Sequence, residues 1–309
     1  MNIIKHRYLF FLISLIIIIP GIVALILWGF PLAIDFTGGS VLEVSFASGV
    51  QPATEEVISL YDDLGIKDAQ VQTTGSDGLI IRSEHIDEVK KDEIVSALTS
   101  TYATDITVDR FDTVGPTVGA EVAKGAVYAV LAAALAIILY ITFAFRGVEH
   151  AFRYGIAAVI AMLHDVAVVC GIQALLAHFL GWEVDSLFLT ALLTVIGFSV
   201  HDTIVVFDRI RENSRLYRRI SYAEVVNHST VQTLARSINT QLTVMLCLLA
   251  LAMFGGVTIR HFVVILLIGV FSGTFSSMFN AAPLLVVWEN HEWKSWFNKE
   301  KMAELLASK

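Results

Sequence analysis

The chain of 309 residues is too apolar for an ordinary soluble protein, since 56% of its residues are hydrophobic and only 16% are charged. Soluble domains carry about 25% charged residues, so much of this apolar surface must face lipid. The formal net charge of −8 does not mean a uniformly acidic surface, because acidic and basic residues are segregated along the chain. The two cysteines, Cys170 and Cys247, lie inside apolar runs, so neither a disulfide framework nor a metal site is indicated.

Six apolar stretches are each long enough to cross a bilayer as a helix, which takes roughly 20 residues. They cover residues 8–30, 125–145, 154–177, 187–207, 238–254 and 262–288. The first follows Lys5 and Arg7, as a signal peptide would, but it is long and has no clear small-residue cleavage site, so we expect a retained anchor. The sequence therefore predicts a polytopic α-helical membrane protein with six transmembrane helices.

Basic residues predict the orientation of these helices. On one side of the membrane lie Lys5, Arg7, Arg146, Arg153, Arg209, Arg211, Arg215, Arg218, Arg219, Arg236, Lys294, Lys299, Lys301 and Lys309. The short loops on the other side contribute only Arg260. By the positive-inside rule, both termini are expected in the cytoplasm. The predicted domains are a cytoplasmic N-terminus with the first helix (1–30), an extracytoplasmic domain (31–121), a bundle of helices two to six (122–290) and a cytoplasmic tail (291–309).

The extracytoplasmic segment 31–121 holds 17 of the 29 acidic residues and five of the 21 basic ones. Apolar residues alternate at 42–46, 70–74, 79–83 and 106–111, as in strands, and recur at helical spacing at 57–64 and 94–102. The order β-α-β-β-α-β predicts a small α+β ferredoxin-like domain. We find no catalytic constellation in it, so we expect a binding or mechanical module rather than an enzyme.

Two glycine-containing motifs mark the points where the chain enters and leaves this domain. The first is DFTGG, which contains Asp35, Gly38 and Gly39, and the second contains Gly115 and Pro116. Paired glycines allow a tight turn or a close approach of backbones, and the aspartate is able to cap such a turn. We interpret both motifs as structural and as a candidate hinge.

Ionisable residues inside predicted spans are functional candidates, because an Asp at the centre of a membrane helix costs about 2.5–3.5 kcal/mol. Asp202 and His201 lie in the fourth span, on a polar or small stripe with Thr190 and Gly197 that should face protein or water. Arg236 lies just before the fifth predicted span, on the same side. Its guanidinium either extends outward to the interface or turns inward to pair with Asp202. An inward pair would break and re-form as Asp202 gains and loses a proton.

Two further polar features lie within the spans. His164 and Asp165 in the third span either take part in ion transfer or form hydrogen bonds within the bundle. The sixth span carries a stripe of small and polar residues, namely Gly269, Ser272, Gly273, Ser276 and Asn280. Such a stripe is typical of close helix packing, and we expect it to offer a surface to a partner helix.

Together these motifs resemble the SecF family, the smaller membrane subunits of the bacterial SecDF protein-export complex, within the RND superfamily. The resemblance covers essentially the whole chain and rests on DFTGG at 35–39, VGP at 114–116, LHDV at 163–166, GFS at 197–199, VFDRIREN at 206–213 and TLAR at 233–236.

This resemblance implies a subunit of the bacterial cytoplasmic membrane that pairs with SecD and associates with the SecYEG channel. YajC and YidC are further candidate partners. Such a subunit uses the proton or sodium motive force to pull unfolded secretory polypeptides outward after SecA-driven entry. The family's intramembrane aspartate corresponds to Asp202, and its functional arginine corresponds to Arg236. The residue before the aspartate is commonly Asn in the family and is His201 here, which leaves the coupling ion open. No cofactor, metal or nucleic acid is implied.

Two other functions compete with this interpretation. One is half of an RND-type small-molecule exporter, but such pumps carry two six-span halves and larger external domains. The other is a scaffold subunit that transduces no energy, in which Asp202 and Arg236 would be replaceable at little cost beyond packing.

Overall fold

The computed structural model describes residues 2–47, 51–147 and 150–294. Clustering of contacts separates two compact units, which are Met1–Pro31 with Ala129–Lys309, and Leu32–Tyr128. The larger unit is a helix bundle and the smaller one contains the sheet. Most of the predicted tail, 291–309, lies outside the described residues.

Within the described part of the chain, six helices are long and apolar enough to cross a membrane, as the sequence predicts. They are α1 (Arg7–Trp28, preceded by the 3-10 turn η1, Ile4–His6), α5 (Pro116–Ala144), α6 (Ala151–Leu180), α7 (Ser186–Leu216), α8 (Tyr222–Phe254) and the pair α9 (Val257–Ser276) and α10 (Ala282–Glu289). Most of these helices extend beyond the predicted apolar stretches, because their polar ends continue the same backbone ladder.

The fifth span begins much earlier than the predicted residue 238. Helix α8 starts at Tyr222 behind a capping box, in which the Glu224 N–H donates to Ser221 Oγ and the Ser221 N–H donates to the Glu224 carboxylate. Its first turns are largely polar, so hydrophobicity alone places the helix start too late. Arg236 therefore lies inside the helix rather than before it.

The sixth span is interrupted by a π-helical segment, η2 (Ser277–Ala281), between α9 and α10. Pro283 lies in the first turn of α10 and has no N–H to donate to a carbonyl one turn earlier. A wider turn before the proline accommodates this missing hydrogen bond. Asn280 within η2 donates its Nδ2–H to Ser14 Oγ of α1 at 2.8 Å, which ties the interruption to the first span.

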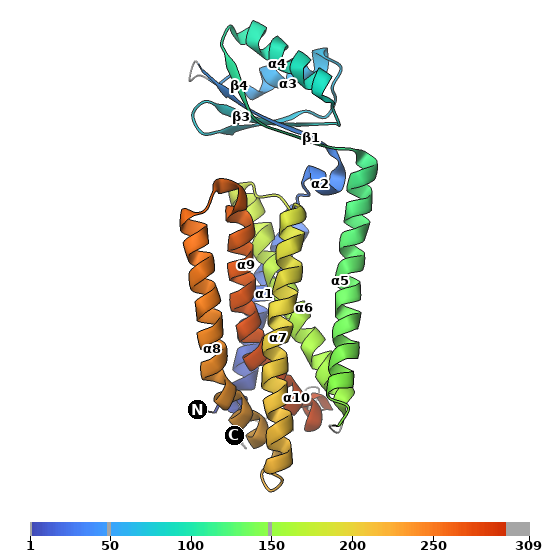
Figure 1. The fold of residues 1–309 in the computed structure, drawn as a ribbon, viewed down its shortest axis with the longest axis vertical. Helices are drawn as coiled ribbons and strands as arrows, with labels where there is room; N and C mark the ends of the chain where they lie inside the picture. Colours follow the sequence, from blue (N-terminus) through green and yellow to red (C-terminus); the bar gives the residue numbers. More distant parts are fainter. Residues whose placement is uncertain (1, 48–50, 148–149, 295–309) are drawn as a thin grey trace. The chain divides into compact units, whose positions relative to one another are not determined.

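The smaller unit has the predicted ferredoxin-like fold (Figure 1). Its elements are the short helix α2 (Ile34–Thr37), β1 (Gly39–Phe46), α3 (Thr54–Asp63), β2 (Gln70–Thr74), β3 (Gly78–Ser83), α4 (Glu88–Tyr102) and β4 (Ile106–Val114). The four strands form an antiparallel sheet in the order β2-β3-β1-β4. Alternate residues of β1, among them Leu42 and Val44, pack against Tyr61 of α3 and Leu98 of α4 to form its core.

The paired glycines lie where backbones approach closely. Gly38 and Gly39 have φ values of +73° and +119°, which strain residues with a side chain. A Cβ on Gly38 would lie 2.7 Å from the Cα of Pro116, and a Cβ on Gly119 would lie 2.6 Å from the Gly38 nitrogen. The DFTGG motif and the first turn of α5 are thus packed against each other inside the smaller unit. A hinge at Gly38–Gly39 and Gly115–Pro116 stays a prediction.

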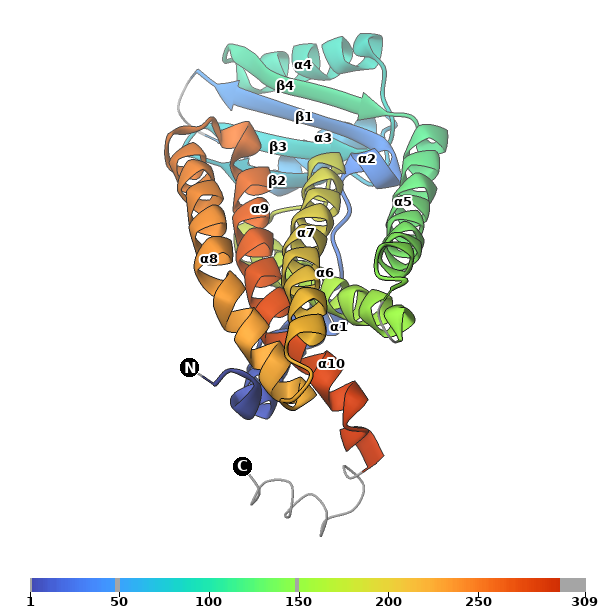
Figure 2. The ribbon, with the colours of Figure 1, turned by 60° about the horizontal axis from the view of Figure 1, so that its bottom comes forward.

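The helices of the larger unit differ in how much of their surface the chain itself covers. The most apolar parts of α6, α7 and α9 are about half buried, whereas those of α5 and α8 are almost wholly exposed. The first half of α8 is different, since residues such as Val226, Thr230 and Ser237 are buried. In two views α8 lies beside α9 (Figures 1 and 2). The exposed residues of α5 include Leu131, Leu135 and Leu139, which suit lipid. Some of the exposed residues of α8 are polar, and polar side chains are poorly solvated by lipid hydrocarbon.

The expectation that the small-residue stripe of the sixth span offers a surface to a partner is wrong. This stripe is buried within the chain, because a Cβ on Gly269 would lie 2.1 Å from a methyl carbon of Val195. A Cβ on Gly273 would lie 3.2 Å from the Cα of Ser199, also on α7. The small residues therefore allow α9 to pack against α7, which is the packing that such spacing typically serves.

A buried ion pair holds the first helix at one end of the bundle. The Arg7 guanidinium donates two hydrogen bonds to the Glu292 carboxylate, at 3.0 and 2.6 Å, and both side chains are more than 90% buried. Tyr8 Oη and Asn290 Nδ2 donate to the same carboxylate at 2.6 and 3.0 Å. Burial raises the pKa of the Glu292 carboxyl, but these hydrogen bonds and the Arg7 charge outweigh it, so the pKa is lowered from 4.5.

Replacing Glu292 by Gln is expected to lower stability at neutral pH, because it leaves the Arg7 charge buried without a counter-ion, a loss of about 3–5 kcal/mol. A carboxyl group whose pKa is lower in the folded state than in the unfolded chain stabilises the fold fully at a pH above the unfolded-state pKa, which is about 4.3 for Glu. This stabilisation is lost as the pH falls through the folded-state pKa. The wild-type Tm in detergent should therefore converge on that of the variant below about pH 4. Glu289→Gln, which breaks the partly exposed pair with Arg153, serves as the control and should change Tm little. A constant difference in Tm from pH 7 to pH 3 would contradict this account.

Candidate functional site

Asp202 is buried at the contact between α7 and α8, with 4% of its surface exposed. Its two oxygens accept hydrogen bonds from Ser237 Oγ at 3.1 Å and Gln241 Nε2 at 3.4 Å. Ser237 and Gln241 are four residues apart, so they present their side chains from one face of α8. An acidic side chain thus lies in an apolar bundle with two uncharged partners.

The partners of Asp202 suit both of its protonation states. A hydroxyl donates to a carboxylate and also accepts from a protonated carboxyl, and an amide does the same by turning its oxygen inward. Gln241 Oε1 is buried and has no hydrogen-bond partner among the described residues. Protonated Asp202 would donate its O–H to an acceptor, and Gln241 Oε1 is an acceptor that is already present beside it.

Arg236 and His201 are the neighbours in sequence of Ser237 and Asp202, but both side chains are exposed. Consecutive residues on a helix point about 100° apart, so Arg236 is directed away from the face that carries Ser237. Within the described part of the chain Arg236 forms no ion pair with Asp202. Of the two predicted positions of the guanidinium, the structure shows the outward one.

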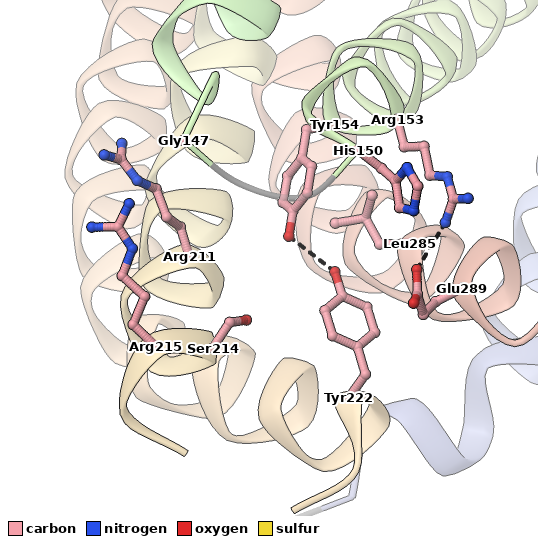
Figure 3. A pocket seen from close by; sticks show the side chains of 10 residues that line it. All are labelled: Gly147, His150, Arg153, Tyr154, Arg211, Ser214, Arg215, Tyr222, Leu285 and Glu289. Carbon is pink, nitrogen blue, oxygen red and sulfur yellow. Dashed lines mark hydrogen bonds and ion pairs between the residues drawn. The ribbon is translucent and has the colours of Figure 1, made fainter. Parts of the chain in front are cut away.

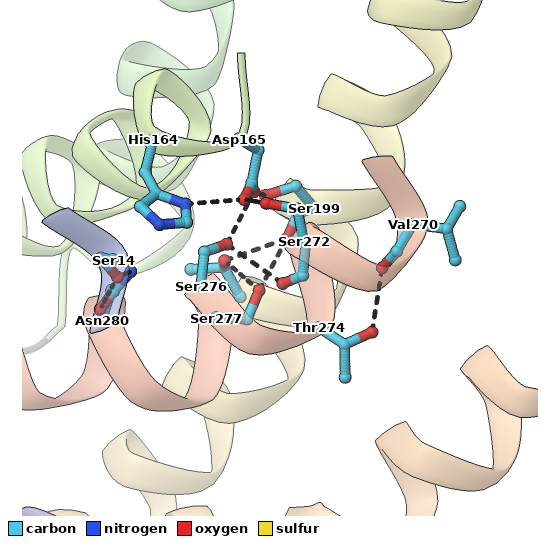
Figure 4. A network of polar contacts seen from close by, with 12 residues as sticks. Ser14, His164, Asp165, Ser199, Val270, Ser272, Thr274, Ser276, Ser277 and Asn280 are labelled. Carbon is cyan, nitrogen blue, oxygen red and sulfur yellow. Dashed lines mark hydrogen bonds and ion pairs between the residues drawn. The ribbon is translucent and has the colours of Figure 1, made fainter. Parts of the chain in front are cut away.

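Asp165 lies on α6, is fully buried and accepts four hydrogen bonds, more than Asp202 (Figure 4). Three donors are serine hydroxyls from two other helices, namely Ser199 at 2.5 Å on α7, and Ser272 and Ser276 at 2.6 Å each on α9. The fourth is Nδ1 of His164, at 3.0 Å. Asp165 therefore joins α6, α7 and α9 at one point through hydrogen bonds within the bundle, and a part in ion transfer stays a prediction.

The polar network around Asp165 extends toward Asp202 without reaching it. Thr203 and Ser277 hydroxyls lie 2.8 Å apart and both donate to the carbonyl oxygen of Ser199. Thr203 follows Asp202 in the sequence, yet no hydrogen bond joins the two aspartates through the described residues. The structure thus places Asp165 and Asp202 in separate sites that share helix α7.

Sequence reasoning missed Ser237 and Gln241, the direct partners of Asp202. Ser237 lies just before the predicted fifth span, 238–254, and Gln241 lies within it, but neither was singled out as a candidate. The available signal was the spacing of Ser237, Gln241 and the preceding Thr230 and Thr233, which gives a polar helical face when the helix is extended backward. The candidate hinge residues Asp35, Gly38, Gly39, Gly115 and Pro116 belong to the smaller unit and are not part of either aspartate site.

Comparison with known proteins gives a consistent result. Residues 94–291 match the family model described as "Protein export membrane protein SecD/SecF, C-terminal", and residues 29–50 match the "SecD/SecF GG Motif". The protein translocase subunit SecF of Anaerolinea thermophila is 58% identical over 300 residues, 97% of each chain. The SecDF subunit of Thermus thermophilus is 36% identical over 85% of this chain but only 35% of its own.

Two solved structures of SecDF have the same fold. The crystal structure of SecDF from Thermus thermophilus, a translocon-associated membrane protein, aligns with a TM-score of 0.79 at 34% identity over 94% of this chain. SecDF in its super-membrane-facing form aligns with a TM-score of 0.67 at 32% identity over 96%. In both cases this chain spans 39% of the SecDF chain. The chain is a multi-pass membrane protein that belongs to the SecD/SecF family of protein export membrane proteins, and within it to the SecF subunits.

Proposed function

We propose that this chain is the SecF-type subunit of a bacterial protein translocase, and that it couples ion flow to the export of secretory polypeptides. The observation that carries the proposal is Asp202, an acidic group buried between membrane-spanning helices, whose hydrogen-bond partners among the described residues are Ser237 and Gln241. A carboxyl group with partners for both protonation states is suited to loading and unloading a proton.

The chain works in the cytoplasmic membrane with both termini in the cytoplasm, which the distribution of basic residues supports. The smaller unit, Leu32–Tyr128, then lies outside, where it acts on emerging polypeptide and moves relative to the bundle. SecYEG, YajC and YidC are the proposed neighbours in the translocase. The coupling ion is a proton or sodium, and the chain has no enzymatic activity of its own.

A SecD-type partner is the most direct structural requirement of this function. Helix α8 exposes Arg236, Asn239, Thr240 and Thr243 along one side, and α7 exposes His201. Lipid hydrocarbon does not solvate such groups, so a protein surface or water must cover them. In the Thermus thermophilus relative, one longer chain named SecDF includes the region that matches this chain, which supports a partner of the SecD type.

Cysteine cross-linking tests this partnership. In a chain whose own Cys170 and Cys247 are replaced by Ser, Thr240→Cys on α8 is expected to form a disulfide or bis-maleimide adduct with cysteines placed along the membrane helices of a co-expressed SecD homologue. Leu135→Cys on α5 is the matched control, since it is 59% exposed but lies on an apolar face that suits lipid. The adducts are measured by gel shift after membrane isolation. Equal cross-linking at both positions, or none at Thr240→Cys, would contradict the assignment of this face to SecD.

Proton coupling and a scaffold role are separated by an export assay. Inverted vesicles that contain the complex take up a secretory protein in the presence of ATP, with and without an imposed ion gradient. The proposed function requires that the gradient increases uptake only when this chain is present and intact. A scaffold would support uptake to the same extent with or without the gradient.

A further inference from the structure

A basic cavity lies at one end of the helix bundle (Figure 3). Its volume is about 240 Å³. It is formed where α6 and α8 begin, where α7 and α10 end, and by Gly147 after α5. The lining residues are Gly147, His150, Arg153, Tyr154, Arg211, Ser214, Arg215, Tyr222, Leu285 and Glu289. Because these are helix ends of a membrane bundle, the cavity lies at the level of the membrane surface.

The charges that line this cavity do not cancel. Arg153 forms an ion pair with Glu289 at 2.8 Å, which neutralises one positive charge. Arg211 donates to the Ala144 carbonyl oxygen at 3.3 Å and forms a partly exposed ion pair with Asp208 at 3.8 Å. Arg215, one turn further along α7, forms no ion pair with any described residue. Among the described residues that line the cavity, Arg215 therefore contributes a positive charge that no ion pair neutralises.

The cavity also has more hydrogen-bond donors than acceptors. The hydroxyls of Tyr154 and Tyr222 lie 3.0 Å apart and form one hydrogen bond with each other. That bond uses only one of the two hydroxyl protons, so the other is left to donate to a further acceptor. Ser214 donates its hydroxyl to the Ile210 carbonyl. Tyrosine hydroxyls and arginine guanidinium groups thus line the same cavity, and donors of this kind favour an anion with several oxygen acceptors.

We propose that this cavity binds a phosphate group, carried either by an anionic phospholipid or by a soluble phosphate compound. Guanidinium groups bind phosphate oxygens in pairs of parallel hydrogen bonds, which makes arginine suited to this ligand. Basic cavities between membrane helices at the membrane surface are typical sites for anionic headgroups. Phe143 and Phe152, at the neighbouring ends of α5 and α6, are 65% and 56% exposed and would contact the acyl chains of a lipid.

The test compares variants of the full chain in phosphatidylcholine nanodiscs with and without phosphatidylglycerol, and lipid retention is measured by native mass spectrometry. Arg215→Gln removes a guanidinium from the cavity, and Tyr222→Phe removes one hydroxyl while keeping the ring. Arg219→Gln is the matched control, since it makes the same charge change outside the cavity. Losing a charge-assisted hydrogen bond at a partly exposed site should lower phosphatidylglycerol affinity about five- to tenfold for Arg215→Gln, and Arg219→Gln should have little effect.

Binding of inorganic phosphate to the detergent-solubilised protein, followed by calorimetry, separates the two sources of the phosphate. Preferential phosphatidylglycerol retention that inorganic phosphate does not displace identifies a lipid site. Saturable phosphate binding that Arg215→Gln weakens, without a preference for phosphatidylglycerol, identifies a site for a soluble compound. Identical behaviour of Arg215→Gln, Arg219→Gln and the wild type in both measurements would overturn the proposal. Tm is measured for each variant, and Tyr222→Phe provides the same test if Arg215→Gln does not fold.

Discussion

Replacing Asp202 by Asn is expected to leave the chain folded and assembled while abolishing the stimulation of export by an ion gradient. The amide has nearly the volume of the carboxyl group and still forms hydrogen bonds with Ser237 and Gln241, so packing of α7 against α8 should persist. The position can no longer alternate between charged and neutral states. One proton moving down a potential of 100 mV releases about 2.3 kcal/mol, and the variant would lose this contribution in every cycle.

The measurement is uptake into inverted vesicles with ATP, in which the rate with an imposed gradient is divided by the rate without it. For the wild type this ratio should exceed one, and for Asp202→Asn it should equal one. Asp208→Asn is the matched control, because it makes the same change on an exposed carboxylate of the same helix. Arg236→Met should give an intermediate ratio, since the guanidinium acts on Asp202 without direct contact. A wild-type ratio in Asp202→Asn would mean that the chain is a scaffold.

Replacing Asp165 by Asn is expected to affect stability more than coupling, with a loss of about 2–4 kcal/mol. The carboxylate accepts hydrogen bonds from three serines and His164, two at each oxygen. In Asn, an NH2 group replaces one of these oxygens, and because it is itself a donor it cannot accept the two hydrogen bonds made there. Hydrogen bonds to a buried charge contribute about 1.5–3 kcal/mol each, and rotation of the serine hydroxyls recovers part of the loss.

Thermal unfolding in detergent measures this effect. Ser272→Ala removes a single donor from the same carboxylate and should lower stability by about 1.5–3 kcal/mol, which sets the scale for one contact. We expect Asp165→Asn to reduce gradient-dependent export less than Asp202→Asn does, once both are normalised to the amount of folded protein. If Asp165→Asn keeps the wild-type Tm but loses the response to the gradient, Asp165 belongs to the ion relay.

The sequence predicts the two units of this chain because each depends on a local pattern. Continuous apolar runs identify membrane helices, and the alternation at Leu42 and Val44 identifies a strand with one buried face. Neither pattern depends on what the segment packs against. The start of α8 is different, since its first turns are polar and its helical state depends on the cap at Ser221 and on contacts with α7.

The candidate site was predictable only in part for a related reason. An acid inside an apolar stretch is visible in the sequence, so Asp202 and Asp165 could both be singled out. Which donors reach each carboxylate depends on helices that are far apart in sequence. Asp165 has four hydrogen-bond donors and Asp202 has two, and this difference in their surroundings is not visible in the sequence. For the same reason the stripe around Gly269 looked available to another chain, although Val195 already fills the space beside it.

The wide turn at Ser277–Ala281 determines which side chains of the sixth span face the core after it. A π-helical turn holds one more residue than an α-helical turn, which rotates everything after it by about 100° around the helix axis. The side of α10 that carries Leu285 and Val286 toward the core is therefore set by that added residue rather than by the periodicity of α9. Removing a single residue between 277 and 281 would return the segment to a regular helix and rotate these two side chains by about 100° around the helix axis, away from the core.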